Sequence, residues 1–306
     1  MRRWGVAALA LVLSTALGSG AIAGTELALT VDDLPTHGAL PAGATRRAIA
    51  DQMIQALKRH AAPGVYGFTN GGQLPDDPAL EEILRAWRHA GFVLGNHTYS
   101  HLDLTRARAA DYVVDIERNE ELLARLSPPG ASKYFRYPYL HEGDTREKRK
   151  AIREWLTARG YTIAQVTVSL EDEWAWNDVY ARCVAINDQD AIARMKRLFL
   201  ESATSRLAAF EELSRRLFGR SIRHILMVHM GAFDALMLDD LLTAYRAAGT
   251  RFISLQEATQ DPAYRLVPRL VQAGGATFLV QVARDRRVPL PDALTRPREE
   301  VARLCR

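Results

Sequence analysis

Short apolar runs alternate along the chain with longer stretches in which hydrophobic residues recur every three to four positions. The short runs are typical of buried strands, and the longer stretches of helices with one apolar face. The runs predict seven strands, at about 27–31, 63–70, 92–97, 133–139, 161–168, 224–229 and 251–255. The amphipathic stretches predict helices at about 45–60, 78–90, 110–126, 145–159, 188–217 and 234–248. This alternation favours a parallel sheet joined by crossover helices.

The predicted sheet could be an open sheet or a closed barrel. No glycine-rich phosphate-binding loop follows the first apolar run, which argues against a dinucleotide-binding sheet. We therefore expect an α/β fold, a (β/α) barrel of about seven parallel strands with active groups at the strands' carboxyl ends. Residues 24–260 would form this catalytic domain. Residues 261–306 are rich in Pro and Arg and predict a C-terminal extension with short elements of its own.

The first 23 residues have the pattern of a secretory signal peptide. Two arginines follow Met1, an apolar stretch runs from Val6 to Leu17, and small residues stand at Ala21 and Ala23. The apolar stretch is shorter than the roughly 20 residues of a membrane-spanning helix. We expect cleavage near Ala23, a periplasmic or secreted protein, and no stable membrane anchor.

Composition and charge narrow the possible partners. The chain is 48% hydrophobic and 25% charged, with a formal net charge of +4, and its arginines are scattered along amphipathic stretches. This pattern predicts no nucleic-acid surface, and nothing in it predicts a protein partner. Cys183 and Cys305 are the two cysteines, and the sequence leaves open whether they form a disulfide. Without nearby His or Cys residues they do not predict a zinc site.

Polar residues collect directly after the predicted strands. In chain order, these groups are Asp32-Asp33, the segment from Asn96 to His101, Arg136 to Tyr139, Glu171 to Trp176, and His229. Because the carboxyl ends of parallel strands meet at one rim of a barrel, we expect these groups to lie close together.

The residue types at this rim suit a hydrolytic metal site. His97 and His101 are four positions apart, which on a helical turn puts both imidazoles on one face. With Asp32 or Asp33 they would form a three-ligand site that leaves positions open for water and substrate. The other aspartate could act as general base and His229 as general acid.

Other rim residues have two interpretations each. Arg136 could be a surface cation, or it could orient the base with Asp172 as its partner, because a guanidinium holds carboxylates firmly. Trp174, Trp176 and Tyr139 could be packing residues, or they could form an apolar wall for a sugar ring or an acyl methyl group.

The order of these motifs resembles that of the polysaccharide deacetylases of carbohydrate esterase family 4. That family has a distorted (β/α) barrel and removes N- or O-acetyl groups with a divalent metal. The resemblance runs from about Glu26 to Leu255. The matching segments are Thr30-Val31-Asp32-Asp33, His97-Thr98-Tyr99-Ser100-His101, Arg136-Tyr137-Pro138-Tyr139 and Leu226-Met227-Val228-His229.

The resemblance implies a role for each matched position. Asp32 would be the general base and Asp33 a metal ligand. His97 and His101 would be the other two ligands, with zinc as the first candidate for the metal, and this donor set also accepts Co, Ni or Fe. The resemblance further implies that Arg136 pairs with the base, that the backbone N–H of Tyr137 helps to bind the oxyanion, and that His229 is the general acid.

Two segments depart from the family pattern. Leu34-Pro35 stands where a glycine commonly follows the two aspartates, so the loop beside the metal should take a different path. The fourth motif is irregular around Glu171 and Asp172, and we take Asp172 as the partner of Arg136 with Glu171 as the alternative.

Together these features predict an exported, metal-dependent deacetylase that acts on an N-acetylated, or O-acetylated, glycan of the cell envelope or outside the cell. Two alternatives remain. The altered loop at Leu34-Pro35 would suit another C–N hydrolase on the same barrel, such as a deformylase or a small-amide hydrolase. The irregular fourth motif would suit a glycan-binding protein without catalytic activity.

Overall fold

The computed structural model describes residues 24–306 except 129–130, 132, 171–172, 273 and 296–298. Its strands form one sheet in which every pairing is parallel. The strands are β1 (Glu26–Leu34), β2 (Tyr66–Thr69), β3 (Val93–Asn96), β4 (Tyr134–Phe135), β5 (Thr162–Ile163), β6 (Val168–Ser169), β7 (His224–His229) and β8 (Arg251–Ile253). The predicted signal peptide, residues 1–23, lies outside this description.

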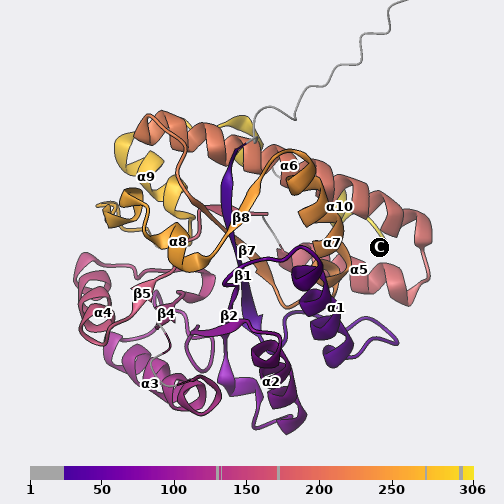
Figure 1. Ribbon diagram of the computed structural model, residues 1–306, viewed down its shortest axis with the longest axis horizontal. Coiled ribbons are helices and arrows are strands. Elements are labelled where there is room, and N and C mark those ends of the chain that lie inside the picture. The colour runs from indigo at the N-terminus through magenta and orange to yellow at the C-terminus, as the bar shows by residue number, and fades with distance from the viewer. Residues whose placement is uncertain (1–23, 129–130, 132, 171–172, 273, 296–298) are drawn as a thin grey trace, which may run out of the picture.

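Helices surround the sheet (Figure 1). They are α1 (Arg46–Arg59), α2 (Glu81–His89), α3 (Ala109–Leu126), α4 (Arg146–Ala158), α5 (Glu173–Ala185), α6 (Gln189–Phe218), α7 (Ala232–Ala247), α8 (Leu255–Thr259), α9 (Phe278–Arg286) and α10 (Glu299–Ala302). The six helices predicted from periodicity are confirmed as α1 to α4, α6 and α7. Helix α5 was not predicted, because residues 171–176 were expected to follow a strand at the barrel rim.

The sheet curls so that its two ends come together. The strand order is β5-β4-β3-β2-β1-β7-β6, with β8 also beside β1. Strands β5 and β6 lie at opposite ends of this order but are joined by residues 164–167. In that connection the N–H of Ala164 bonds Phe135 on one side and the N–H of Thr167 bonds Ile225 on the other. The distorted barrel is confirmed, and the single strand expected at 161–168 is two short strands.

Strand β1 is the centre of the sheet (Figure 1). It pairs with β7 from Leu27 to Asp32, with β2 over its carboxyl-terminal half and with β8 over its first residues. All of its residues after Glu26 are buried. Both faces of β1 are covered, so its sequence is a continuous apolar run and does not alternate.

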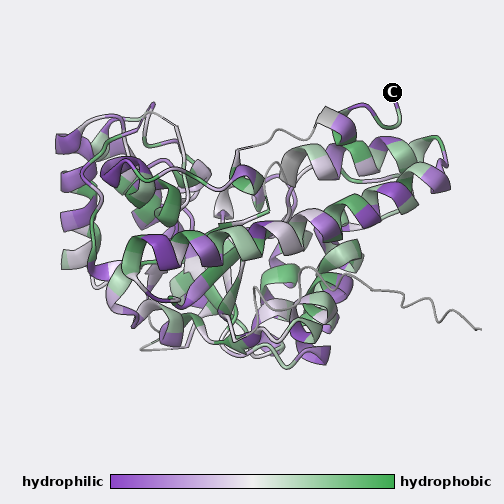
Figure 2. Cartoon of the chain, turned by 90° about the horizontal axis from the view of Figure 1, so that it is seen from above, coloured by the Kyte–Doolittle hydropathy of each residue, from purple (hydrophilic) through white to green (hydrophobic). Residues whose placement is uncertain are grey.

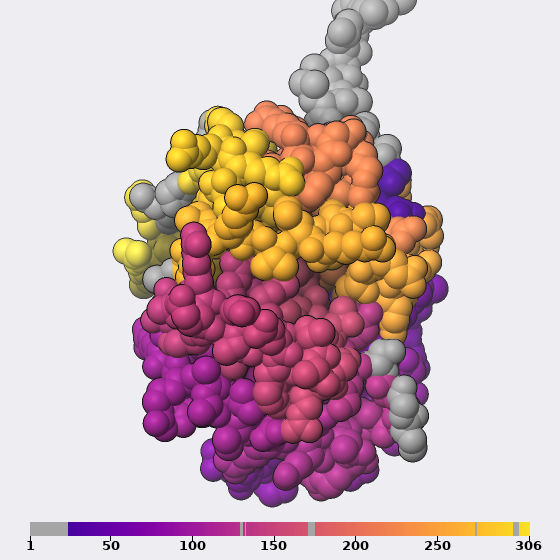
Figure 3. Space-filling model, turned by 90° about the vertical axis from the view of Figure 1, so that its left-hand side faces the viewer, coloured from indigo at the N-terminus to yellow at the C-terminus, as the bar shows by residue number. Residues whose placement is uncertain are grey.

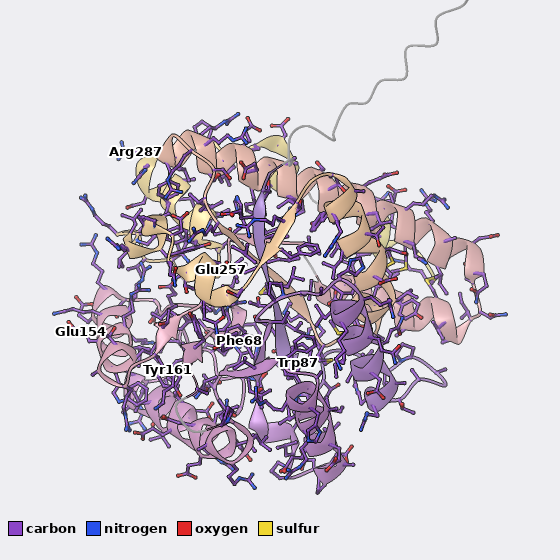
Figure 4. All side chains as sticks on the ribbon, viewed as in Figure 1. Phe68, Trp87, Glu154, Tyr161, Glu257 and Arg287 are labelled. Carbon is purple, nitrogen blue, oxygen red and sulfur yellow. A yellow bond between two sulfur atoms is a disulfide. The ribbon has the colours of Figure 1, made fainter. Side chains whose placement is uncertain are left out.

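Hydrophobic and hydrophilic residues alternate along the helices, as expected for helices that cover a core (Figure 2). The predicted apolar stripe of α1 is buried and includes Ile49, Met53 and Leu57. Phe68 and Trp87 lie in the interior, whereas Glu154 and Arg287 project from the periphery (Figure 4). No helix among the described residues is long and apolar enough to cross a membrane.

The C-terminal extension packs onto the barrel. Phe278, Leu279 and Val282 of α9 belong to the main hydrophobic core. The part of the extension before α10 lies next to the segment around α4 (Figure 3), where Arg149 donates to the Pro268 carbonyl. Cys183 in α5 and Cys305 near the end of the chain form a disulfide, which settles the question that the sequence left open.

A buried polar network also joins the extension to the barrel. The Glu142 carboxylate, which follows β4, accepts hydrogen bonds from Arg149 and Arg153 of α4 at 3.0 Å each. It also accepts hydrogen bonds from Gln165 and from Gln281 of α9, both at 3.1 Å. The extension is therefore held by charged and apolar contacts together.

Candidate active site

The end of β1 carries a buried ion pair. Arg136 Nη1 lies 3.0 and 3.1 Å from the two carboxylate oxygens of Asp32, and Nη2 donates to Thr30 Oγ1. Thr30 and Asp32 are two positions apart in a strand, so both side chains point to the same face. Arg136 Nε donates to the Ala164 carbonyl, and the guanidinium lies 4.5 Å from the centre of the Phe68 ring. Burial lowers the pKa of Arg136, and the Asp32 carboxylate opposes that shift.

Arg136 therefore orients Asp32 directly, as one interpretation of the sequence proposed. Asp172 and its alternative Glu171, the predicted partners of Arg136, lie outside the described residues.

Asp33 breaks the alternation of the strand. In a regular strand it would point away from the face that holds Asp32. Its φ is 61°, in the left-handed region that aspartate adopts more readily than most residues, and the β1–β2 register shifts between Val31 and Leu34. This local turn directs both carboxylates to the same rim.

His97 and His101 reach Asp33 from the loop after β3. The loop is not the helical turn that the four-residue spacing suggested, because Thr98 and His101 have φ values of 60° and 55°. Asn70 Nδ2 holds the loop by donating to the carbonyls of His97 and Thr98. His97 Nδ1 bonds the Arg136 carbonyl at 2.8 Å, which leaves Nε2 directed toward Asp33.

These three side chains fit a divalent metal ion. Asp33 Oδ1 lies 3.4 Å from His97 Nε2 and 3.2 Å from His101 Nε2. Two ligands at about 2.1 Å from one tetrahedral ion are themselves about 3.4 Å apart. Asp33 Oδ1 is buried and has no hydrogen-bond partner among the described residues, which a metal ion would supply.

Electrostatics favours an ionised Asp33. Burial alone would raise the pKa of Asp33, but the imidazoles of His37, His97 and His101 together lower it well below its usual range. Burial lowers the pKa of His101 to about 4, so this imidazole is neutral near pH 7. Burial also opposes a proton on His97, but the carboxylates of Asp33 and Asp32 raise its pKa.

His229 stands beside Asp32, since the two are paired residues in the register of β7 and β1. Burial, with a contribution from His37, lowers the pKa of His229 to about 4. Its Nδ1 is buried without a hydrogen-bond partner among the described residues. The predicted rim thus brings His229 together with the carboxylates of β1.

The site residues line a cleft of about 370 Å³. Asp32, Asp33, His97, His101 and His229 lie in it, and so do Tyr137 and Tyr139. The backbone N–H of Tyr137 has no acceptor among the described residues. The Tyr139 ring is half exposed and lies 4.4 Å from the ring of His101.

Among the described side chains, the predicted tryptophan wall does not line this cleft. Trp176 is buried in the core, where it stacks on Phe233 at 5.4 Å and meets Phe199 edge-on. It lies in α5, and its position in a helix turns it toward α6 and α7. Trp174 is in the first turn of the same helix, and its side chain lies outside the description.

The extension supplies a wall that the sequence did not predict. Its contributions to the cleft are Gly275, Ala276, Thr277, Val280, Arg284 and Leu294. A Cβ at Gly275 would lie 1.9 Å from the Tyr139 carbonyl oxygen, so only glycine fits against the loop that carries Tyr139. No pattern in the sequence indicates this contact, since Gly275 and Tyr139 are far apart in the chain.

His37 is another site residue that the sequence did not predict. Its Nδ1 bonds Asp33 Oδ2 at 2.7 Å, and its ring centre lies 4.5 Å from that of His229. The available signal was a histidine four positions after Asp33, in the loop where Leu34-Pro35 departs from the family pattern.

The family model described as polysaccharide deacetylase matches residues 21–176, just over half of the 306 residues. The chain belongs to the polysaccharide deacetylase family. The matched span includes Asp32, His97 and Arg136 and ends before His229. A peptidoglycan-N-acetylglucosamine deacetylase of Bacillus cereus is 30% identical over 169 residues, which are 55% of this chain and 53% of that protein. The chain therefore spans about half the length of this relative.

Two solved structures share the fold of this polysaccharide deacetylase family member. A family 4 carbohydrate esterase of Bacillus subtilis aligns with a TM-score of 0.50 and 19% identity, over 77% of this chain and 80% of its own. A pseudoenzyme of the same esterase family aligns with a TM-score of 0.51 and 14% identity, over 76% and 67%. At these identities the likeness shows the fold alone.

Proposed function

We propose that this chain is an exported, metal-dependent deacetylase that hydrolyses N-acetyl or O-acetyl groups of a cell-envelope or extracellular polysaccharide. The observation that carries the proposal is the pairing of two differently held carboxylates. Asp32 is bound by Arg136, whereas Asp33 Oδ1 faces two imidazoles and has no other described partner. Asp32 is thus suited to accept a proton, and Asp33 is suited to bind a metal ion.

Asp33, His97 and His101 would hold the metal, for which zinc is our first candidate because imidazole and carboxylate donors suit it. When bound, such an ion lowers the pKa of a water molecule and polarises a carbonyl group.

Asp32 would take a proton from the attacking water, with Arg136 fixing the direction of its oxygens. His229 would deliver a proton to the leaving amine nitrogen or alcohol oxygen, so that water and the acetylated sugar become acetate and the free sugar group. Its pKa of about 4 means that the resting imidazole is neutral. Negative charge that develops on the substrate oxygen would raise this pKa, so His229 would take up a proton from solvent in the substrate complex, and Asp32 would return to solvent the proton that it took from the attacking water.

The remaining cleft residues would position the acetyl group. The N–H of Tyr137 could donate to the oxyanion, and Tyr139 could pack against the sugar ring. The extension would bound the sugar site on the other side, through Val280 and Leu294.

An acetate-release assay tests this proposal. We expect the zinc-loaded protein to release acetate from acetylated chito-oligosaccharides or peptidoglycan fragments, and the chelated protein to release none. The panel should include formamides and small amides, which a C–N hydrolase of the alternative kind would cleave. Cleavage of these amides without acetate release from any glycan or acetyl ester would reject the substrate, and binding of glycans without any hydrolysis would reject catalysis.

Export has its own support and test. The leader pattern at residues 1–23 and the disulfide both suit a protein that matures in an oxidising compartment. We expect the mature protein to be found outside the cytoplasm with an N-terminus near residue 24, which N-terminal sequencing would establish.

A further inference from the structure

The loop after β1 brings a third histidine to the candidate metal site. His37 is 2% exposed, and its Nδ1 lies 2.7 Å from Asp33 Oδ2. An ionised carboxylate only accepts hydrogen bonds, so the proton of this bond is on Nδ1. The two oxygens of Asp33 are therefore divided, with Oδ2 bound to His37 and Oδ1 facing His97 and His101.

The other side of the His37 ring meets His229. The two ring centres are 4.5 Å apart and the planes are inclined by 32°. His37 therefore touches both a predicted metal ligand and the predicted general acid.

The position of His37 is fixed by the backbone around it. The His37 N–H donates to the Met230 carbonyl at 3.0 Å, next to His229 in the chain. Arg46 of α1 donates to the carbonyls of His37 and Gly38 at 3.1 and 2.8 Å.

Asn177 of α5 closes the loop from another side. Its Nδ2 donates to the Ala39 carbonyl at 3.1 Å. Gly38 has a φ of 64°, and a Cβ there would lie 2.3 Å from that same nitrogen. Met230, Arg46 of α1 and Asn177 of α5 thus all bind this short loop.

We propose that His37 is a positioning residue that fixes Asp33 for the metal and supports the ring of His229. This inference rests on the metal site of the proposed function and not on its substrate. A hydrogen-bonded partner orients a metal-ligating carboxylate and makes it a better ligand.

The structure offers one competing arrangement. Asp33, His37 and His229 also lie close enough together to hold an ion, so Asp33 could bridge two metals. We favour the hydrogen bond because 2.7 Å between Nδ1 and Oδ2 is a normal hydrogen-bond distance, whereas ligands of one ion lie farther apart.

Two substitutions separate the two contacts of His37. In His37→Asn the amide nitrogen takes the place of Nδ1, so the bond to Asp33 is kept and the ring is lost. In His37→Phe the ring is kept and the donor is lost. The measurement is the zinc dissociation constant, by competition with a chromogenic chelator, together with the number of zinc ions per chain and kcat and KM.

We expect one zinc per chain in every case. His37→Phe should weaken zinc binding by about 10- to 100-fold, and His37→Asn by only a few-fold. His37→Asn should lower kcat with KM little changed, since it removes the ring beside His229. His60→Phe is the matched control, because His60 Nε2 bonds Asp239 at 3.1 Å outside the cleft, and it should leave zinc affinity unchanged.

Equal loss of zinc affinity in both His37 variants would overturn the proposal, since it would indicate a structural role only. Two zinc ions in the wild type and one in both variants would also overturn it, by making His37 a ligand. If His37→Phe does not fold, His37→Gln replaces it, because its amide nitrogen reaches the position of Nε2 and not of Nδ1. Zinc binding is read without substrate, so a wrong substrate would not affect the result.

Discussion

Asp32 and Asp33 are neighbours in sequence but have different surroundings. The side chain of Asp32 is held by the guanidinium of Arg136, and its partner residue in the neighbouring strand is His229. Asp33 is turned by its positive φ toward three imidazoles. Two carboxylates of one type can therefore serve two purposes, because the backbone between them leaves the extended conformation.

This difference predicts the effect of Asp32→Asn. The amide keeps the shape of the side chain and an oxygen for Arg136, but it takes up a proton far less readily than a carboxylate. We expect kcat for acetate release to fall by about 10²- to 10⁴-fold while zinc affinity changes only a few-fold. Steady-state kinetics and chelator competition measure the two quantities.

Asp239→Asn is the control for this variant. Asp239 also pairs with an arginine, Arg59 at 3.0 Å, but on the surface and away from the cleft. It should keep wild-type kinetics. An Asp32→Asn protein with full activity would reject Asp32 as the base.

The sequence identified the residues that end strands and missed those that depend on loops. Asp32, His97 and His229 follow apolar runs, and parallel strands bring their ends to one rim. His37 reaches the site through contacts that its loop makes with Met230, Arg46 and Asn177, which no local pattern encodes. Local patterns also do not show contacts between distant segments. The sequence therefore predicted a wall of tryptophans for the cleft, whereas the structure has a wall formed by the extension.

At the level of elements, the spacing of hydrophobic residues correctly predicted those helices that have one exposed face. Helix α5 was not predicted because its hydrophobic residues do not form one clear stripe. Trp176, Val179 and Cys183 are buried, and the helix packs on both α6 and α7. The run at 161–168 was read as one strand because its residues favour extended structure. Its two halves pair with opposite ends of the sheet, which only the curled sheet of the folded protein shows.

The network around Glu142 predicts an acid-dependent loss of stability. Burial would raise the pKa of Glu142, but Arg149 and Arg153 lower it below the usual value. A lowered folded-state pKa means that the ionised group stabilises the protein above its unfolded pKa of about 4.3 and that this contribution is lost as pH falls through the folded value. Glu142→Gln should cost about 3 kcal/mol at pH 7.

The cost of Glu142→Gln should shrink as pH falls below about 4.3, because the unfolded wild-type chain then binds a proton at Glu142 that the folded chain binds only at lower pH. Denaturant unfolding between pH 3 and 7 measures this. Glu154→Gln is the control, since Glu154 is exposed and 3.7 Å from Lys150, and it should change stability by less than about 0.5 kcal/mol. A cost of Glu142→Gln that is the same at every pH would contradict this account.

At the level of the whole molecule, the disulfide ties the end of the chain to α5. Cys183 and Cys305 are 122 positions apart, so the bond closes a long loop in the unfolded chain. The double variant Cys183→Ser, Cys305→Ser should lower the free energy of unfolding by about 2 to 5 kcal/mol. Denaturant unfolding with and without reductant measures this, and reductant should have no effect on the double variant. Equal stability of the oxidised wild type and the double variant would reject a stabilising role.

The pairing of β1 has a consequence for how the protein is made. The first strand to leave the ribosome has β7 as its full-length neighbour, and Thr30 bonds Leu226, which is 196 positions later. Contacts over such distances form slowly, because much of the chain must be ordered before they are made. Until residues 224–253 have been synthesised, Asp32 lacks His229 and β1 lacks two of its three partners. The cleft is thus among the last parts of the molecule to assemble, even though its two aspartates are among the first residues of the fold.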